Sequence, residues 1–361
     1  MAEKIVTIVG VGIIGEPLVG LATDFKNLLG ADEVIFTKKT PASKDAVKVR
    51  RLKERGALFA VEEDLMNDFR RVGMPADLTI DEALHRSTVI IDCTNEGIEN
   101  KKKNYMRLKD RAKLIAAQGS EEGFGLPYAR IASDGSPGLA EYDDIFFQIM
   151  SCNAHNIIAL YRLAKGEGNT SVIKKARFVL VRRANDIGET KKFIPSPEVG
   201  KHKYGRRGSH QAHDAWRLLK TNCNVDVDLF SSEAKSNSQY MHVIHFNFEF
   251  NNGGITKEEF IRRIYADHLV APTFKTSTTE VFGFGRNQGY FGRILNQTVI
   301  PIDSIDVTEN EVIGFCFTPQ DGNSLLSSFS AIAKGFHPIR YLDIMKEVEE
   351  MTNPRLVFDE V

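Results

Sequence analysis

Short apolar runs alternate with helical patterns along the first third of the chain. The apolar runs are IVTIVG, EVIFTKK, ALFAV, STVIIDCT and KLIAAQG. Segments with helical periodicity, among them PLVGLATDFKNLL and EDLMNDFRRVG, lie between these runs. Regular alternation of strand and helix is typical of a parallel sheet with helices on both faces. The pattern therefore predicts a doubly wound α/β domain at the start of the chain.

The pattern changes near Phe178, where apolar and polar residues begin to alternate one by one. The alternating runs are RFVLVRR, HVIHFNFEF, TVIPIDSIDV and EVIGFCFT. A period of two predicts half-buried strands, so we expect a mostly antiparallel sheet in a second, α+β domain. The helical segments SLLSSFSAIAKG and YLDIMKEVEEM then close the chain. We expect the first domain at residues 1–151, completed by helices at about 325–361, and the second at 152–324.

The composition is typical of a soluble protein and favours no particular charged partner. The 361 residues are 42% hydrophobic and 26% charged, and the formal net charge is −1. No apolar run approaches the roughly 18 residues that span a bilayer, so we expect a cytoplasmic protein. A near-neutral chain has no general attraction for nucleic acid or acidic lipid. The cysteines form no CxxC pair and no metal-ligand spacing, so we expect free thiols and no metal site. They are Cys93, Cys152, Cys223 and Cys316.

The segment IVTIVGVGIIGEPLVG contains a GxGxxG motif directly after a predicted strand and at the start of a predicted helix. Gly10 permits a tight turn, Gly12 allows a pyrophosphate to approach the backbone, and Gly15 allows close packing of helix on strand. We therefore expect a Rossmann-type dinucleotide site, with Ile13 and Ile14 in the same turn as further cofactor contacts.

The second predicted strand, EVIFTKK, ends without the acidic residue that commonly holds the ribose of NAD. Thr37, Lys38 and Lys39 stand there instead. Two cations in place of a carboxylate favour the 2′-phosphate of NADP, and NAD is a second possible cofactor. The competing interpretation is that the two lysines simply end a surface strand.

Cys152 lies in IMSCNAHN, at the start of a predicted helix. Unsatisfied N–H groups and partial positive charge at a helix start favour the thiolate, so we expect a readily ionised nucleophile. The alternative is a small, buried, apolar cysteine.

With these features in view, the chain resembles the archaeal-type (class II) glyceraldehyde-3-phosphate dehydrogenases over nearly its whole length. The segments that carry the resemblance, in order, are IIDCTNEGIENKKKNYM, AAQG, SCN, VRRAND, SHQAHD, YMHVIH, TSTTE and the region around Gln320. The resemblance implies a homotetrameric NAD(P)-dependent enzyme of glycolysis or gluconeogenesis that acts on glyceraldehyde 3-phosphate and inorganic phosphate.

The implied mechanism is covalent. The Cys152 thiolate forms a hemithioacetal, a hydride passes to NAD(P), and phosphate releases 1,3-bisphosphoglycerate. The resemblance assigns the general base to His242. Strand alternation in HVIHFNFEF puts His242 on one face with Ile244, Phe246 and Phe248, and His245 on the other face.

The resemblance also implies further site residues. Those expected to bind the cofactor are Cys93, Thr94, Gly119, Arg183 and Gln320. Those expected to bind the substrate are Ser151, Asn153, Arg182, His210 and Gln211. The basic loop GKHKYGRRG could hold phosphate or be a solvated loop. A nucleic-acid partner is not expected, because the rest of the chain is not basic.

The chain departs from the family just after its nucleophile. Two threonines are expected there, and this sequence has Ala154 and His155. Three interpretations stay open: a phosphorylating enzyme in which His155 or Asn156 replaces a threonine donor, an acylating dehydrogenase with another acceptor, or one that hydrolyses the thioester. A fourth, from another class, is a nucleotide- or RNA-binding protein on the same fold.

Overall fold

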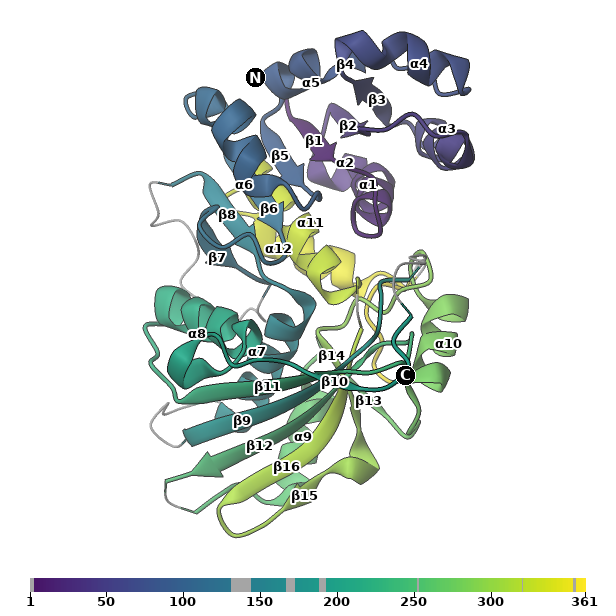
Figure 1. Cartoon of the computed structure of the whole chain (residues 1–361). Helices are drawn as coiled ribbons and strands as arrows, with labels where there is room; N and C mark the ends of the chain where they lie inside the picture. Colours follow the sequence, from purple (N-terminus) through teal and green to yellow (C-terminus); the bar gives the residue numbers. More distant parts are fainter. Residues whose placement is uncertain are drawn as a thin grey trace. The chain divides into compact units, whose positions relative to one another are not determined.

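The structure is a computed structural model that describes residues 3–130, 144–166, 173–187, 193–251, 253–319, 321–352 and 355–361 (Figure 1). The chain divides into two compact units. The first contains the described residues of Met1–Arg130, Leu139–Ile149 and Leu325–Val348. The second contains those of Met150–Ser324 and Glu349–Val361.

The first unit is built on an eight-stranded sheet in the order β4-β3-β2-β1-β5-β6-β8-β7. Every pair of neighbours in it is parallel. The strands are β1 (Ile5–Val9), β2 (Glu33–Thr37), β3 (Leu58–Val61), β4 (Leu78–Thr79), β5 (Val89–Asp92), β6 (Leu114–Gln118), β7 (Leu126–Tyr128) and β8 (Phe146–Ile149). The order reverses at β1, as it does in doubly wound sheets, and the predicted fold class is confirmed.

Helices connect these strands. They are α1 (Gly15–Asp24), α2 (Lys26–Leu29), α3 (Ala46–Glu54), α4 (Met66–Arg71), α5 (Ile80–Arg86) and α6 (Gly97–Asn100), followed by the short turns of Lys101–Tyr105 and Met106–Leu108. The α5 helix shows how local sequence fixes a helix start. Thr79 accepts a hydrogen bond from the Glu82 backbone N–H, and the Glu82 carboxylate accepts one from Thr79 in return.

The helix α11 (Asn323–Phe336) packs on the parallel sheet from Leu325 onward, followed by α12 (Tyr341–Glu350). A side chain at Gly335 would meet Val89 of β5, which shows how closely α11 approaches the strands. The chain end differs from our expectation, because Glu349–Val361 cluster with the second unit. The reason is a set of specific contacts, including a hydrogen bond from Val361 N–H to the Pro272 carbonyl at 3.0 Å.

The second unit is built on a mixed sheet in the order β10-β11-β9-β12-β16-β14-β13, with β15 beside β16. Only the β9/β11 and β13/β14 pairs of the described residues are parallel, so the predicted mostly antiparallel sheet is confirmed. The strands are β9 (Ile173–Arg182), β10 (Glu198–Val199), β11 (Leu229–Lys235), β12 (His242–Phe250), β13 (Val270–Thr273), β14 (Thr298–Pro301), β15 (Asp306–Val307) and β16 (Glu311–Thr318). The helices are α7 (Cys152–Lys165), α8 (His210–Cys223), α9 (Lys257–Ala266) and α10 (Thr278–Gln288).

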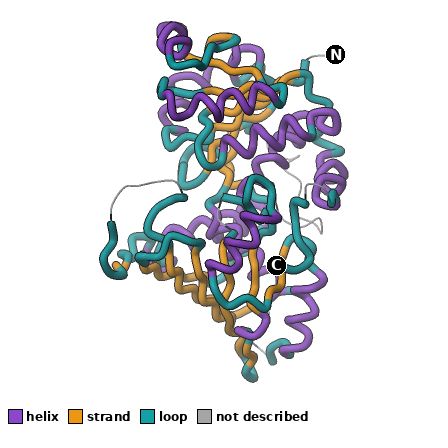
Figure 2. The backbone as a smooth tube through the Cα atoms, turned by 90° about the vertical axis from the view of Figure 1, so that its right-hand side faces the viewer, coloured by secondary structure: helices purple, strands orange, loops and turns teal. Residues whose placement is uncertain are grey.

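The central strand β12 alternates between a buried and a half-exposed face along its whole length. Phe246 and Phe248 on the buried face pack with Phe178 and Phe260. The helices α7, α8 and α9 contact strands of this sheet, and Figure 2 shows the strands lying side by side as one layer. His242 therefore lies on the buried face and His245 on the other, as the alternation predicts.

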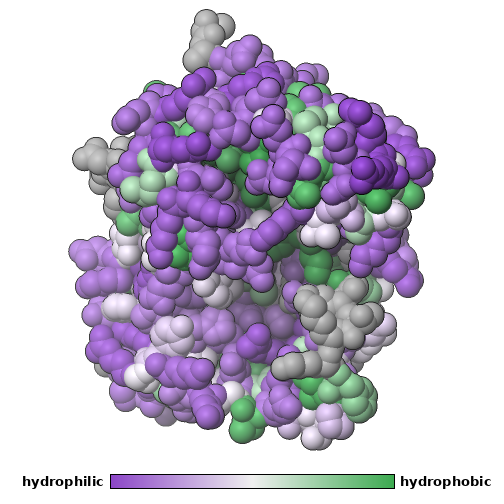
Figure 3. All heavy atoms as spheres, turned by 45° about the horizontal axis from the view of Figure 1, so that its top comes forward, coloured by the Kyte–Doolittle hydropathy of each residue, from purple (hydrophilic) through white to green (hydrophobic). Residues whose placement is uncertain are grey.

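Hydrophilic side chains cover most of the face drawn in Figure 3, with apolar side chains gathered in small patches. Among the helices of the described residues, none combines the length and the apolar composition that crossing a bilayer requires.

Candidate active site

Cys152 is the first residue of α7, as predicted. Ser151 precedes it in an extended conformation, with φ −64° and ψ 158°. The Ser151 hydroxyl makes no capping bond, and its buried oxygen has no hydrogen-bond partner within the described residues. The Cys152 carbonyl is fixed by the Asn323 side-chain amide, which donates to it at 2.8 Å. The backbone at Cys152 is therefore fixed, and the Ser151 hydroxyl beside it has no partner within the described residues.

His242 is joined to the same helix start through the neighbouring strand. It lies opposite Thr318 of β16, and the Thr318 hydroxyl donates to the Asn153 side-chain oxygen at 3.2 Å. On the other side, the Arg183 backbone N–H donates to His242 Nδ1 at 3.0 Å. Because Nδ1 accepts this bond, the neutral imidazole carries its proton on Nε2.

Arg183 is almost fully buried between two carboxylates. Its Nη2 lies 2.7 Å from Asp186 and 3.2 Å from Asp321. The Arg183 Nε is buried without a hydrogen-bond partner in the described part of the chain. Burial raises the pKa of the Asp321 carboxyl, and the charge of Arg183 opposes that rise. Asp321 is a site residue that the sequence alone did not reveal.

The Cys152 thiol does not have the low pKa that its helix position suggested. Burial raises the pKa of this thiol to about 12, and the Asp321 charge adds to the rise, while Arg183 and Arg182 oppose it. This pKa does not agree with the expected ready ionisation, because loss of solvent outweighs the effect of the helix start. Burial also moves the His242 pKa well below its usual value, and Arg183 and Arg182 lower it further. Thiol and imidazole are thus both influenced by Arg183, which is buried, and by Arg182, which is partly exposed.

Three of the expected substrate residues, Arg182, His210 and Gln211, interact with a carboxylate that the sequence did not single out. Glu233 Oε2 accepts hydrogen bonds from Arg182 Nη1 at 3.0 Å and from Gln211 Nε2 at 2.8 Å. His210 begins α8, and burial lowers its pKa while the Glu233 charge opposes that effect. Arg182 Nε is buried and has no partner among the described residues.

His155 and Asn156, the candidate replacements for the missing threonine donors, both have hydrogen-bond partners within the second unit. Both are buried within α7. His155 Nδ1 lies 2.9 Å from the Ser151 carbonyl, and burial lowers the pKa of its imidazole to about 4. The Asn156 amide donates to the Thr318 hydroxyl. Both side chains thus have partners in the interior, and the role of either one as the replacement donor stays a prediction.

The glycine motif has the geometry that a dinucleotide requires. Gly10 has φ +86° and donates its N–H to the Thr37 hydroxyl at 3.2 Å. A Cβ at Gly15 would lie 1.9 Å from the Gly10 carbonyl oxygen, whereas a Cβ at Gly12 would meet nothing within 4 Å. Gly15 therefore closes α1 against β1, and space remains over Gly12. Ile13 and Ile14 are half-buried in the same turn.

The ends of β5 and β6 supply the other expected cofactor residues of the first unit. The Asp92 carboxylate, at the end of β5, accepts from Thr94 N–H at 2.9 Å and from the Thr94 hydroxyl at 2.6 Å. Burial raises the pKa of the Cys93 thiol well above its usual value. Gly119 follows β6 with φ +83°, and its carbonyl accepts from Gln148 at 2.9 Å. Gln320 lies outside the described residues.

The two lysines after β2 have carboxylate partners that the sequence did not suggest. Lys38 Nζ lies 2.7 Å from Asp45, and Lys39 Nζ lies 2.8 Å from Glu96. Thr37 is buried and bonded to Gly10. The lysines are thus part of a local charge network.

Comparison with known proteins agrees with this geometry. No family model matches the chain. A glyceraldehyde-3-phosphate dehydrogenase of Sulfolobus acidocaldarius is 27% identical over 322 residues, covering 86% of each chain. Glyceraldehyde-3-phosphate dehydrogenase 2 of Methanosarcina acetivorans is 28% identical over 327 residues, covering 87% of this chain and 88% of its own. The Methanothermus fervidus enzyme is 24% identical over 321 residues, covering 86% of each chain.

The chain is a relative of the archaeal-type glyceraldehyde-3-phosphate dehydrogenases. This relationship supports an oxidoreductase that uses a nicotinamide dinucleotide.

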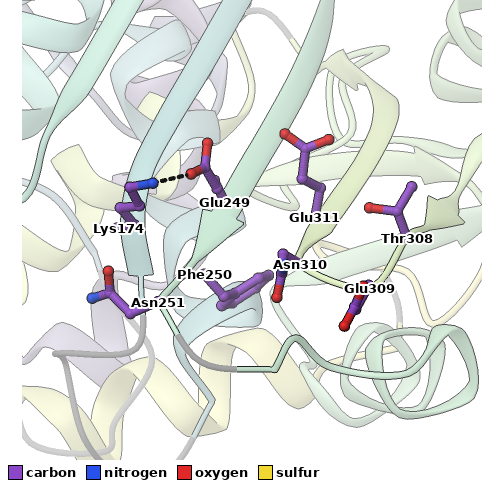
Figure 4. Close-up of a pocket in the computed structure, with 8 residues that line it drawn as sticks. All are labelled: Lys174, Glu249, Phe250, Asn251, Thr308, Glu309, Asn310 and Glu311. Atoms are coloured by element: carbon purple, nitrogen blue, oxygen red, sulfur yellow. Dashed lines mark hydrogen bonds and ion pairs between the residues drawn. The ribbon is translucent and has the colours of Figure 1, made fainter.

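An open pocket of about 450 Å³ lies elsewhere in the second unit of this glyceraldehyde-3-phosphate dehydrogenase relative (Figure 4). Glu249 and Phe250 line it at the end of β12, whereas His242 begins that strand. Its other lining residues are Lys174, Asn251, Thr308, Glu309, Asn310 and Glu311. The pocket is therefore separate from the residues expected to be catalytic.

Proposed function

We propose that the protein is a phosphorylating glyceraldehyde-3-phosphate dehydrogenase that prefers NADP, with Cys152 as the nucleophile. One observation supports this most strongly. The starts of α7 and β12, which carry Cys152 and His242, are joined through the Asn153–Thr318 hydrogen bond. The glycine turn in the first unit fits a dinucleotide, since Gly12 leaves open space and Gly15 cannot accept a side chain.

In the proposed reaction, the Cys152 thiol gives its proton to water, and its Sγ then bonds to the aldehyde carbon, whose oxygen becomes an alkoxide. The alkoxide so formed expels a hydride, which oxidises the carbon to a thioester. A nicotinamide dinucleotide, which the turn of Gly10, Gly12 and Gly15 would hold, would supply the acceptor for that hydride. A phosphate oxygen then attacks the thioester carbon, the carbon–sulfur bond breaks, and the Cys152 thiolate leaves as 1,3-bisphosphoglycerate is released.

His242 is proposed to act first as a donor. Its Nδ1 accepts from Arg183 N–H, so its Nε2–H can stabilise the alkoxide of the hemithioacetal. Action as a base at Nε2 requires the other tautomer, in which the Arg183 bond is lost. Arg182, His210 and Gln211 are proposed to bind the substrate phosphate around Glu233, and Ser151 supplies a hydroxyl beside Cys152.

A second candidate function concerns the acyl acceptor, the molecule that releases the acyl group from Cys152. The family's threonines are replaced by Ala154 and His155, and both of these residues are buried. This favours, as the alternative, a related dehydrogenase that passes the acyl group to another nucleophile or to water. A binding protein without catalysis is less well supported, because Cys152, Asn153 and His242 are all present.

The test is NADPH formation from glyceraldehyde 3-phosphate with and without inorganic phosphate or arsenate. The proposal expects steady turnover only when phosphate or arsenate is present. Equal turnover without either anion would identify the hydrolytic alternative. No NADPH under any condition, with NAD also inactive, would contradict a dehydrogenase acting on this substrate.

A further inference from the structure

Helix α3 brings a lysine directly to the glycine turn. Lys48 Nζ lies 3.4 Å from the Val11 carbonyl oxygen, and Val11 stands between Gly10 and Gly12. The same Nζ lies 3.1 Å from the Glu16 carboxylate, in the first turn of α1. Lys48 is thus a cation at the turn where the dinucleotide is proposed to bind, although it lies far along the sequence from the GxGxxG motif.

Asp45, at the residue before α3, lies within the same group of charges. Its carboxylate is 2.7 Å from Lys38 Nζ, and both side chains are largely buried, with exposed fractions of 17% for Lys38 and 18% for Asp45. Burial pushes the pKa of this carboxyl up, but the bond and charge of Lys38 lower it overall. Lys48 and Lys44 add to the lowering. Three lysines therefore surround two carboxylates, Asp45 and Glu16, and leave one positive charge in excess.

We propose that Lys38 and Lys48 together bind the 2′-phosphate of NADP, and that Asp45 is a competing carboxylate that limits the preference for NADP over NAD. This inference rests on the proposed function. A 2′-phosphate carries nearly two negative charges, whereas the Asp45 carboxylate carries one. If the phosphate replaces Asp45 as the partner of the lysines, the electrostatic attraction to them increases. Lys39 is left outside this proposal, because its side chain is 77% exposed and pairs with Glu96, after β5, rather than with Asp45 or Glu16.

The structural alternative is that these ion pairs only fasten α3 to the rest of the first unit. A matched control on the same helix separates the two ideas. Lys53 pairs with Asp77 at 2.7 Å, and its pair has exposed fractions of 29% and 31%. The Lys48–Glu16 pair has 28% and 32%. Lys53 therefore matches Lys48 in exposure and pairing, but its partners, Asp77 and the Pro75 carbonyl, lie outside the glycine turn.

The experiment is calorimetric titration of the full-length protein with NADP, NAD, adenosine 2′,5′-bisphosphate and 5′-AMP. Lys48→Met should weaken NADP and the bisphosphate about tenfold and leave NAD and 5′-AMP within about twofold, as for the loss of one charge-assisted bond. Lys48→Arg should keep most of the preference for NADP over NAD. Lys53→Met should change the affinity for neither dinucleotide. Asp45→Asn should tighten NADP alone.

Equal weakening of NADP and NAD by Lys48→Met, or no effect on either, would overturn the inference and leave the proposed function intact. Failure of the wild-type protein to bind any dinucleotide would overturn the proposed function, and the inference with it.

Discussion

At the residue scale, His242 stays the candidate catalytic histidine, but the structure favours a different role for it from the one expected. His242 lies on the buried face of β12, as the alternation predicts, but its Nδ1 is taken by the Arg183 N–H. With its proton on Nε2, His242 can donate a hydrogen bond to an oxyanion. To act as a general base, Nε2 must instead be unprotonated and accept a proton. Substitutions that keep or remove a donor can separate these roles.

His242→Ala should lower turnover by roughly two to four orders of magnitude, the range expected when a positioned catalytic group is lost. His242→Gln retains an N–H donor of similar reach, so it should recover at least roughly tenfold of that loss if donation to the alkoxide matters. Turnover is measured as NADPH formation at saturating substrate. His245→Gln is the control, because His245 lies on the half-exposed face beside Phe315. Equal loss in His242→Ala and His242→Gln would instead favour the base.

At the element scale, the glycine turn shows which features a sequence can predict. The spacing of Gly10, Gly12 and Gly15 predicted the tight turn and the close packing of α1, because both are local consequences of the missing Cβ. Period-two alternation predicted the two faces of β12, because successive side chains of a strand point to opposite faces of the sheet. The partners Glu233 and Asp321 could not be predicted, since their ion pairs join residues far apart in sequence. Asp45 lies near Lys38 in sequence, but the pair depends on the path of the loop between β2 and α3, which no periodicity reveals. One signal was available at Asp92, an acid ending an otherwise apolar strand run.

The two glycines should respond differently to the same change. Gly12→Ala should leave the free energy of unfolding nearly unchanged, because the new Cβ meets nothing within 4 Å, yet it should weaken dinucleotide binding at least about tenfold. Gly15→Ala should lower stability, because its Cβ would lie 1.9 Å from the Gly10 carbonyl oxygen. Urea unfolding and calorimetric titration measure the two effects. Normal dinucleotide affinity in Gly12→Ala would contradict a pyrophosphate over this turn.

Helix α7 should make the protein sensitive to acid. Burial lowers the His155 pKa from an ordinary value near 6.5 to about 4, so the unfolded chain binds the proton first as pH falls. The contribution of His155 to the free energy of unfolding should therefore be fully present above about pH 6.5. It should decline by about 3 kcal/mol as the pH falls from about 6.5 to 4. His242, with its lowered pKa, adds a loss of the same sign.

His155→Gln keeps a donor for the Ser151 carbonyl but does not titrate, so its unfolding free energy should decline less steeply over this window. The measurement is urea unfolding at pH 7, 5.5 and 4.5. Parallel pH profiles for wild type and variant would show that His155 does not contribute.

At the scale of the whole molecule, the resemblance predicts a homotetramer, and the second unit has a surface suited to self-association. Val179, Val181 and Phe315 on the open face of the sheet are exposed by 46%, 40% and 44%. Sedimentation should give a mass near four times 40.4 kDa. Phe315→Glu should reduce that mass if this face is used. A wild-type monomer at micromolar concentration would contradict the prediction.

In the proposed reaction, Cys152 carries the acyl group and phosphate removes it. The most direct measurement is peptide mass spectrometry after mixing the protein with glyceraldehyde 3-phosphate and NADP in phosphate-free buffer. We predict a phosphoglyceroyl adduct on the peptide that contains Cys152. This adduct should be absent from Cys152→Ser and should be lost rapidly when phosphate is added. An adduct at Cys93, Cys223 or Cys316, no adduct at all, or one that disappears equally fast without phosphate would contradict it.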